Sequence, residues 1–157
     1  MPKTGQTVYG SKYMTGFGGK GANQAIMASL LGSRVFMVAK LGNDDVAHST
    51  LANFERHGVN SKFVSQAPDT ASGIAAITVT HSGENCIILA PGSNLLLGDE
   101  DLEKARETIC SCSVLLCQNE ILPSITLSAM QMAKGKGPLV VLNAAPAPAA
   151  APLAAPL

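Results

Sequence analysis

Short apolar runs alternate with longer stretches of helical spacing along most of this chain. Apolar residues recur at helical spacing and predict helices over residues 21–31, 46–56, 99–109 and 123–134. Short runs rich in Val, Ile, Leu and Phe predict strands over residues 34–41, 59–66, 114–118 and 139–143. Strands that alternate with helices are typical of a parallel sheet covered by helices. We therefore expect an α/β fold with a doubly wound parallel sheet.

Residues at the ends of the first two helices support these bounds. Gly32 directly follows the first helix and Gly58 comes two residues after the second, where glycine commonly ends a helix. The run Asn43-Asp44-Asp45 precedes the second helix, where such side chains cap the free backbone N–H groups. Both helices therefore carry their own start or stop signals.

Three segments do not follow this alternation of strands and helices. Apolar residues 73–79 and 85–89 flank a polar loop that contains Gly83, which predicts an antiparallel hairpin outside the parallel sheet. Residues 1–15 are polar and rich in Gly and Thr, with a short alternation at 7–9, and predict an edge strand or hairpin arm. From 144 to 157 only Ala, Pro and Leu remain, which predicts a disordered tail without titratable side chains.

Length and charge exclude several classes of function. The 157 residues fit one domain, and the formal net charge of +0 leaves no basic patch for a nucleic-acid backbone. No apolar run reaches the ~18 residues that span a membrane. Because the start, Met1-Pro2-Lys3-Thr4, lacks the apolar segment of a signal peptide, we expect a cytoplasmic protein that binds a small molecule or another protein.

Four cysteines are present, and their spacing argues against a metal or redox site. Cys110 and Cys112 are one residue apart, which is not the C-x-x-C spacing, and no His lies near them in the sequence. Cys117 sits within an apolar run, as a small core residue would. Cys86 is the fourth. We expect four reduced structural thiols and no metal ligands.

The most informative stretch is residues 16–25, where an extended segment turns into the first helix. It combines several glycines with Lys20 and the amide of Asn23. Glycines allow positive φ and close approach of a ligand, and the first N–H groups of a helix point at whatever binds there. This combination predicts a site for a polyhydroxylated or anionic small molecule.

Two nucleotide-binding motifs fit this stretch poorly. A P-loop needs G-x-x-x-x-G-K-[ST], but Met14 stands at its first position and Gly21 at its last. A G-x-G-x-x-G dinucleotide fingerprint does match at Gly16, Gly18 and Gly21. However, the segment before it is a poor strand, and no acid ends the strand that follows. We therefore do not expect a dinucleotide site.

A family resemblance accounts for the stretch better. Gly18-Gly19-Lys20-Gly21-Ala22-Asn23-Gln24-Ala25 resembles the first signature of the ribokinase/PfkB sugar-kinase family. Further segments resemble that family in the same order: residues 1–5 (a lid arm), 70–94 (the lid hairpin and the loop after it), 115–120 (a strand that delivers a sugar-binding glutamate) and 143–147 (an Asn-Pro-Ala-Pro-Ala segment). The resemblance implies a partial Rossmann-like ribokinase fold over residues 1–143, with lid pieces at about 1–15 and 70–92.

The resemblance also implies roles for single residues. Gly19, Lys20, Asn23 and Glu120 would contact sugar hydroxyls. The apolar lid residues that would close over the ring are Ala75, Ile77 and Leu89. Taken alone, Lys20 would be a solvated lysine and Glu120 a surface carboxylate, and core packing of Ile77 and Leu89 is compatible with ligand contact.

The implied activity is ATP-dependent phosphorylation of D-ribose to ribose 5-phosphate, with Mg²⁺ and K⁺. In that family an Asn-x-Asp pair on a preceding strand and a later Gly-Ala-Gly-Asp segment, whose Asp is the base, complete the site. Neither segment occurs in this sequence. We therefore expect a truncated and inactive form with no catalytic and no metal-binding residues, through a frameshift, a gene-model error or a truncating isoform.

Other functions stay open at this point. One is a non-catalytic module that binds a sugar or forms a homodimer through its lid. Another is a fragment of a different PfkB sugar or nucleoside kinase. The resemblance implies a cytoplasmic location, with the nucleus as a second compartment.

Overall fold

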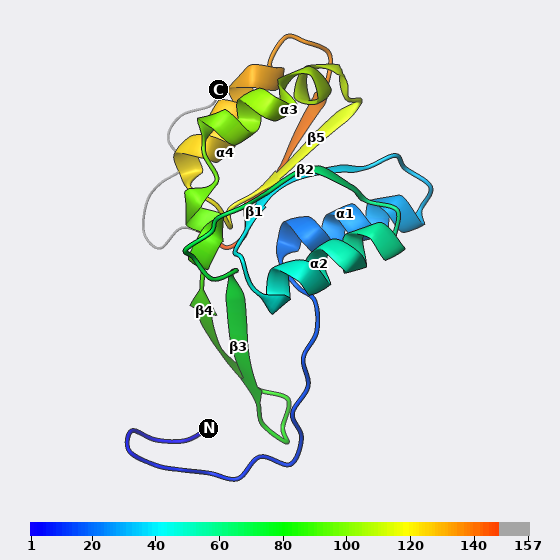
Figure 1. Ribbon diagram of the computed structural model, residues 1–157. Coiled ribbons are helices and arrows are strands. Elements are labelled where there is room, and N and C mark those ends of the chain that lie inside the picture. The colour runs from blue at the N-terminus through cyan, green and yellow to red at the C-terminus, as the bar shows by residue number, and fades with distance from the viewer. Residues whose placement is uncertain (148–157) are drawn as a thin grey trace.

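The computed structural model describes residues 1–147 of the chain. Two pairs of parallel strands lie between two pairs of helices (Figure 1). The strands β1 (Phe36–Leu41) and β2 (Asn60–Gln66) form one pair, and β5 (Val114–Gln118) and β6 (Leu139–Asn143) form the other. The helices are α1 (Lys20–Leu30), α2 (Asp45–Arg56), α3 (Asp99–Ser111) and α4 (Pro123–Ala133). The predicted α/β class is confirmed.

Alternating side chains of β1 and β2 pack into two separate cores. Val38 and Phe63 face the helices α3 and α4, whereas Met37 and Val64 face α1 and α2. This assignment follows from the period of two along a strand, which sends neighbouring side chains to opposite faces. The sheet is therefore covered by helices on both faces, as in a doubly wound fold.

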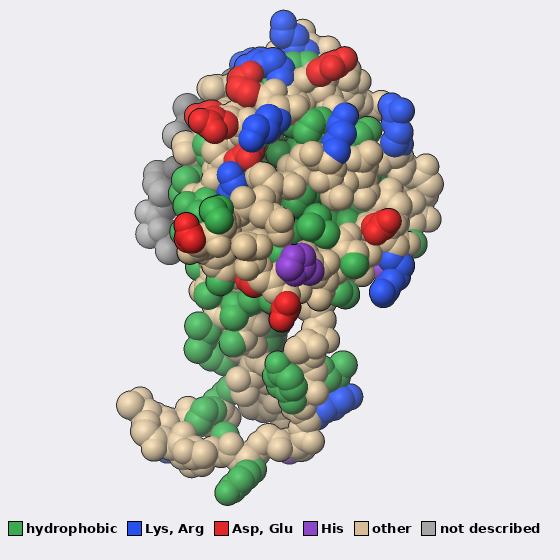
Figure 2. Space-filling view, viewed as in Figure 1, with side chains coloured by type: hydrophobic (Ala, Val, Ile, Leu, Met, Phe, Trp, Pro, Cys, Tyr) green, Lys and Arg blue, Asp and Glu red, His purple; other side chains and the backbone are tan. Residues whose placement is uncertain are grey.

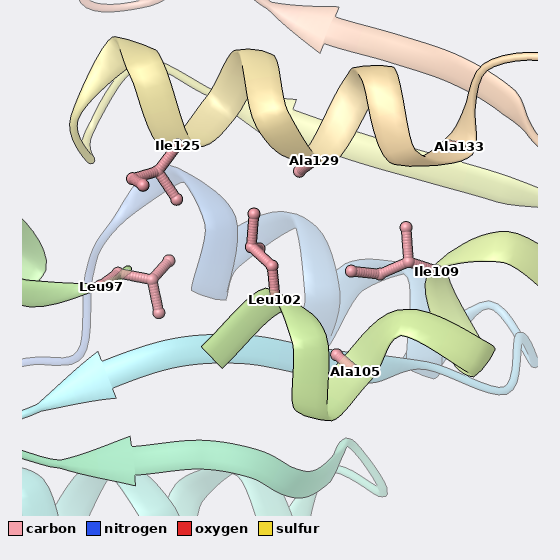
Figure 3. Packing of buried hydrophobic residues seen from close by; sticks show 7 residues of the cluster. All are labelled: Leu97, Leu102, Ala105, Ile109, Ile125, Ala129 and Ala133. Atoms are coloured by element: carbon pink, nitrogen blue, oxygen red, sulfur yellow. The ribbon is translucent and has the colours of Figure 1, made fainter. Parts of the chain in front are cut away.

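The larger core lies between α3 and α4 and is shown in Figure 3. Leu102 of α3 points toward α4 between Ile125 and Ala129, Ile109 lies below Ala133, and the small residue Ala105 belongs to the same cluster. Alanine at such positions lets two helices approach closely, so the larger side chains interdigitate. Leu115 and Val140 of the second strand pair also pack against this core.

Local sequence signals placed most of these elements correctly. The strands β5 and β6 have the predicted bounds, and the other strands and the helices begin and end within two residues of theirs. Gly32 and Gly58 have φ values of 90° and 69°, as expected for glycines that end a helix. The Asp44 carboxylate accepts a hydrogen bond from the Ala47 N–H at 2.8 Å and caps α2.

The strands do not form the single sheet that the sequence pattern predicts. Within the described residues, β1 pairs only with β2 and β5 only with β6. In a doubly wound sheet, the strand before α1 would be the natural element to lie between β1 and β5. Residues 1–19 precede α1 and form no strand, so no ladder of hydrogen bonds joins the two pairs.

The predicted edge strand or hairpin arm at residues 1–15 is wrong. The segment is exposed throughout, and its single backbone turn is closed by the Gln6 N–H donating to the Lys3 carbonyl. Its Gly, Thr and Ser residues offer little apolar surface to bury, and Tyr9 is fully exposed. Since an isolated strand without a partner gains no ladder hydrogen bonds, the segment stays unpaired.

The predicted tail lies mostly outside the described residues, which end at 147. Ala145 and Pro146 are described, and their carbonyls accept hydrogen bonds from the Asn119 backbone at 3.1 Å and side chain at 3.3 Å. Residues 144–147 therefore lie beside the loop that follows β5.

The antiparallel hairpin is confirmed. It consists of β3 (Ile74–Val79) and β4 (Asn85–Ala90) and is followed by the short 3-10 helix η1 (Gly92–Leu96). The hairpin extends away from the layered body (Figure 1), and every residue of both strands is exposed. Hydrophobic side chains gather over this projection in Figure 2. The hairpin therefore has two apolar faces and no core of its own.

A buried carboxylate fastens α3 to both strands of the first pair. Asp101 is 4% exposed and accepts hydrogen bonds from Lys40 Nζ of β1 and Ser65 Oγ of β2, both at 2.8 Å. It also accepts from the Gly98 N–H at 3.0 Å, at the start of α3. Burial by itself would raise the pKa of Asp101, but the donors on Lys40, Ser65 and Gly98 outweigh it and lower that pKa.

We expect Asp101→Asn to lower the free energy of unfolding by about 2 kcal/mol at pH 7, because it leaves the Lys40 ammonium without its partner. A lowered folded-state pKa stabilises the protein above the unfolded value of ~3.9. That stabilisation disappears as the pH falls through the folded pKa. The difference in free energy of unfolding between wild type and variant, measured by urea denaturation, should therefore become smaller below about pH 4.

The matched control is Glu103→Gln, which changes an exposed acid on the same helix. It should change the free energy of unfolding by less than about 0.5 kcal/mol. An Asp101→Asn difference that stays constant from pH 7 to pH 3 would contradict the ion-pair argument.

Candidate functional site

The first turn of α1 and the loop after β5 meet at one point. Gly19 has φ 91°, a left-handed conformation that lets the extended segment turn sharply into α1. The Lys20 N–H then donates to Glu120 Oε2 at 2.6 Å. Because the N-terminus of a helix carries a partial positive charge and free N–H groups, a carboxylate is stabilised there. The structure therefore brings Gly19, Lys20 and Glu120 together, although 100 residues separate the last two.

The side chains of Lys20 and Glu120 also lie side by side and stay open to solvent. Lys20 Nζ is 3.9 Å from Glu120 Oε1, and the two side chains are 38% and 23% exposed. At this distance the ion pair is loose, so both groups keep free hydrogen-bonding capacity. The pair presents one donor group and one acceptor group at the same place.

Next to this site, two glutamines that the sequence analysis did not single out join β5 to α1. Gln118 Nε2 at the end of β5 donates to Gln24 Oε1 of α1 at 2.6 Å. A Cβ on Gly21 would lie 2.8 Å from Gln118 Oε1, so a larger residue there would displace the Gln118 amide. The sequence does carry one sign of this contact, because the polar amide of Gln118 ends an otherwise apolar strand.

The remaining predicted site residues are less closely engaged. Asn23 lies on the first turn of α1, where its N–H donates to the Gly19 carbonyl at 2.9 Å and its side chain is exposed. On the hairpin, Ala75 pairs with Leu89, and Ile77 lies on the same face. All three lie exposed on the hairpin that extends away from the layered body.

Other features of the described residues contribute no chemistry to this site. A broad hollow of about 700 Å³ lies between α2 and β2, lined by His48, Glu55 and Lys62 among others, but none of the predicted site residues lines it. Within residues 1–147 no group of three or more His, Cys, Asp or Glu side chains is arranged to hold a metal ion. None of the helices described is both long and apolar enough to cross a membrane.

The cysteines form no disulfide in the part of the chain that the structure describes. All four are free, and Cys86 alone is exposed. Burial raises the pKa of the Cys117 thiol to about 11, so that thiol stays protonated at neutral pH.

Comparison with known proteins gives one consistent result. The profile of the pfkB family carbohydrate kinases matches residues 2–156. The ribokinase of Mus musculus is 41% identical over 147 residues, which are 94% of this chain and 46% of the mouse protein. The deoxyribokinase of Salmonella typhi is 39% identical over 94% of this chain and 48% of its own length. This chain therefore spans about half the length of the curated relatives that it matches.

Solved structures agree with the sequence comparison. The ribokinase of Giardia lamblia superposes with a TM-score of 0.84 and 31% identity, over 94% of this chain and 46% of that one. The ribokinase of Arabidopsis thaliana, complexed with ribose and ATP, superposes with a TM-score of 0.78 and 29% identity, over 90% of this chain and 46% of that one.

The Glu120 contact makes a testable contribution to α1. We expect Glu120→Ala to lower the free energy of unfolding by about 1 kcal/mol, because the Lys20 N–H loses a charged acceptor at the helix N-terminus. Amide hydrogen exchange should accelerate in the first turn of α1 and not in α3. Glu120→Gln keeps an acceptor oxygen but no charge and should lose less, whereas a Glu120→Gln variant as stable as wild type would show that the carboxylate charge does not matter.

Proposed function

Because this chain belongs to the pfkB family of carbohydrate kinases, we propose that it carries the D-ribose-binding part of a ribokinase-type enzyme. The sugar would bind at Gly19, Lys20, Asn23 and Glu120, at the N-terminus of α1. Residues 1–143 would be a partial kinase domain, with residues 1–15 and 70–92 as lid pieces. The proposed compartment is the cytoplasm.

The observation that carries this proposal is the pairing of Lys20 with Glu120 at the first turn of α1. Sugar hydroxyls both donate and accept hydrogen bonds. The Glu120 carboxylate accepts, the Lys20 ammonium donates, and the exposed Asn23 amide does both. Fixed polar groups of this kind, beneath an apolar cover, are typical of small-molecule sites. Ala75, Ile77 and Leu89 would supply the cover.

The choice of sugar rests on the relatives. Ribokinases are among them, and the Arabidopsis ribokinase was solved with ribose and ATP. The Salmonella deoxyribokinase is nearly as similar, so 2-deoxyribose is the competing substrate. Because these sugars differ by one hydroxyl, comparing their affinities tests which groups of the site recognise that position.

Phosphoryl transfer itself requires groups that this sequence does not supply. The reaction depends on positioning the nucleotide and stabilising charge on the transferred phosphoryl group. The described residues contain no carboxylate cluster that fits Mg²⁺, and the chain has no Gly-Ala-Gly-Asp segment to provide the base. We propose that ATP, Mg²⁺ and K⁺ belong to the activity of a whole family member, and that the 157-residue chain binds sugar without turnover.

A second function is favoured by the hairpin alone. Both of its faces are apolar and exposed, with Ile77 57% and Ile88 71% exposed. Large exposed apolar patches mark interaction sites, and the outer edges of β3 and β4 are free to pair among the described residues. We propose that the hairpin also joins two copies of the chain into a homodimer.

Sugar binding is tested by titrating the purified chain with D-ribose and following heat or backbone amide shifts. We expect Lys20→Ala and Asn23→Ala each to weaken binding about 10-fold or more, since each removes a hydrogen bond to the sugar. The control Lys104→Ala changes an exposed lysine of α3, outside the site and the lid pieces, and should bind as wild type does. Ribose-dependent ATP consumption with Mg²⁺ and K⁺ should be absent, and turnover that Lys20→Ala abolishes would contradict the non-catalytic proposal.

Dimerisation is tested by sedimentation equilibrium. The wild-type chain should sediment as a dimer at micromolar concentration, and Ile88→Asp should yield a monomer because a charge would be buried at the interface. The matched control is Val46→Asp, which places the same charge at an exposed apolar position of α2. A wild-type monomer, or a dimer that survives Ile88→Asp, would exclude this hairpin face as the interface.

A further inference from the structure

Three loops meet at the base of the hairpin, and their backbones touch at two glycines. Residues 42–44 follow β1, residues 70–73 lead into β3, and residues 91–94 follow β4. A Cβ on Gly42 would overlap the backbone at Thr70 and Ser72, and one on Gly73 would lie 2.7 Å from the Pro91 carbonyl oxygen. Glycine is needed at both positions because the backbones touch directly.

The Asp44 carboxylate ties this junction together. Its Oδ1 accepts from the Ala47 N–H at 2.8 Å and from Ser72 Oγ at 2.7 Å. Its Oδ2 accepts from the Ser72 N–H at 2.7 Å. Ser72 is 3% exposed, and its Oγ accepts in turn from the Gly42 N–H at 2.9 Å. One carboxylate therefore fixes the entry into β3 to the start of α2.

The exit from β4 is held by a second buried serine. Ser93 is fully buried, its N–H donates to the Ala71 carbonyl at 2.9 Å, and its Oγ donates to the Lys40 carbonyl at 3.0 Å. The entry and exit of the hairpin are thus fastened to each other and to the end of β1. Beyond this point the hairpin has no buried residue, so its direction depends on the junction.

From this arrangement we infer that Asp44 is a positioning residue, which acts through Ser72 to set the direction of the hairpin relative to the body. This inference rests on the proposed function, because a cover over the sugar must hold Ala75, Ile77 and Leu89 at a defined angle to Lys20 and Glu120. Asp44 would not touch the sugar, and its effect on binding would be indirect.

Capping of α2 alone does not explain the contacts of Asp44. A helix cap needs one side-chain oxygen, here Oδ1 on the Ala47 N–H. The bond from Oδ2 to the Ser72 N–H joins residues 28 apart and contributes nothing to the cap. A serine at position 44 keeps the capping function and loses the second oxygen, so the two roles are separable.

The direction of the hairpin can be measured with spin labels on the full 157-residue chain. One label is attached to the exposed Cys86 of β4 and the other to a Lys104→Cys substitution on α3, with the three remaining cysteines changed to Ala. All samples also carry Ile88→Asp, so that a homodimer through the hairpin adds no distances between copies. Double electron–electron resonance should give a narrow distance distribution in this background. Asp44→Ser and Ser72→Ala should each broaden it about two-fold or shift it, and the control Asp45→Ser should not.

Amide exchange in the same variants separates positioning from stability. Protection of α2 should stay within about two-fold of wild type in Asp44→Ser, because serine still caps the helix. An unchanged distance distribution in both variants would overturn the inference, as would loss of α2 protection in parallel with the broadening. If Asp44→Ser fails to fold, the milder Asp44→Asn and Ser72→Ala carry the same test.

A separate experiment tests whether the hairpin junction affects sugar binding. D-ribose should bind Ser72→Ala several-fold more weakly than wild type, while Asp45→Ser binds normally. Equal affinity in Ser72→Ala and wild type would overturn the role in sugar binding. If neither wild type nor any variant binds ribose, the proposed function is refuted. If the spin-label distance distribution still depends on Asp44 in that case, the inference that Asp44 positions the hairpin stands.

Discussion

The carboxylate of Asp101 joins α3 to β1 through Lys40 and to β2 through Ser65. Much of the fold depends on this contact, because no ladder of hydrogen bonds connects the two strand pairs among the described residues. The link between the pairs is instead made by helices: α3 packs on α4, and α4 covers β5 and β6. The ion pair is inside a protein, so it stabilises only because additional donors satisfy the remaining lone pairs of the carboxylate.

The second link between the strand pairs is α1, and it coincides with the candidate site. Glu120, in the loop after β5, accepts a hydrogen bond from the Lys20 N–H, and Gln118 at the end of β5 donates one to Gln24. One carboxylate therefore holds α1 against the end of β5 and remains partly exposed. Open α/β folds commonly bind ligands at the carboxyl ends of their strands, so under the proposed function the same groups would make both structural contacts and contacts to the sugar.

Local signals explain what could be predicted from the sequence. Periodicity, together with Asp44, Gly32 and Gly58, marked helices and strands within a few residues, because caps and turns act over three or four positions. The site residues Gly19, Lys20 and Glu120 came from a family resemblance, and the structure brings them together. Contacts such as Lys40 with Asp101 or Gln24 with Gln118 join residues 61 and 94 apart, and no local pattern encodes them. The strand expected at residues 1–15 failed for the same reason, since a strand exists only where another strand pairs with it.

The register of the hairpin determines whether its two proposed roles are compatible. Ala75 pairs with Leu89, and Ile77 with Ile87, so these side chains share one face. Ile74 pairs with Ala90, and Ala76 with Ile88, on the opposite face. A cover over a sugar needs only the first face, which leaves the second for another copy of the chain. Because both faces belong to one pair of strands fixed at a single base, contact with a partner on one face would also restrict the angle of the other toward Lys20 and Glu120.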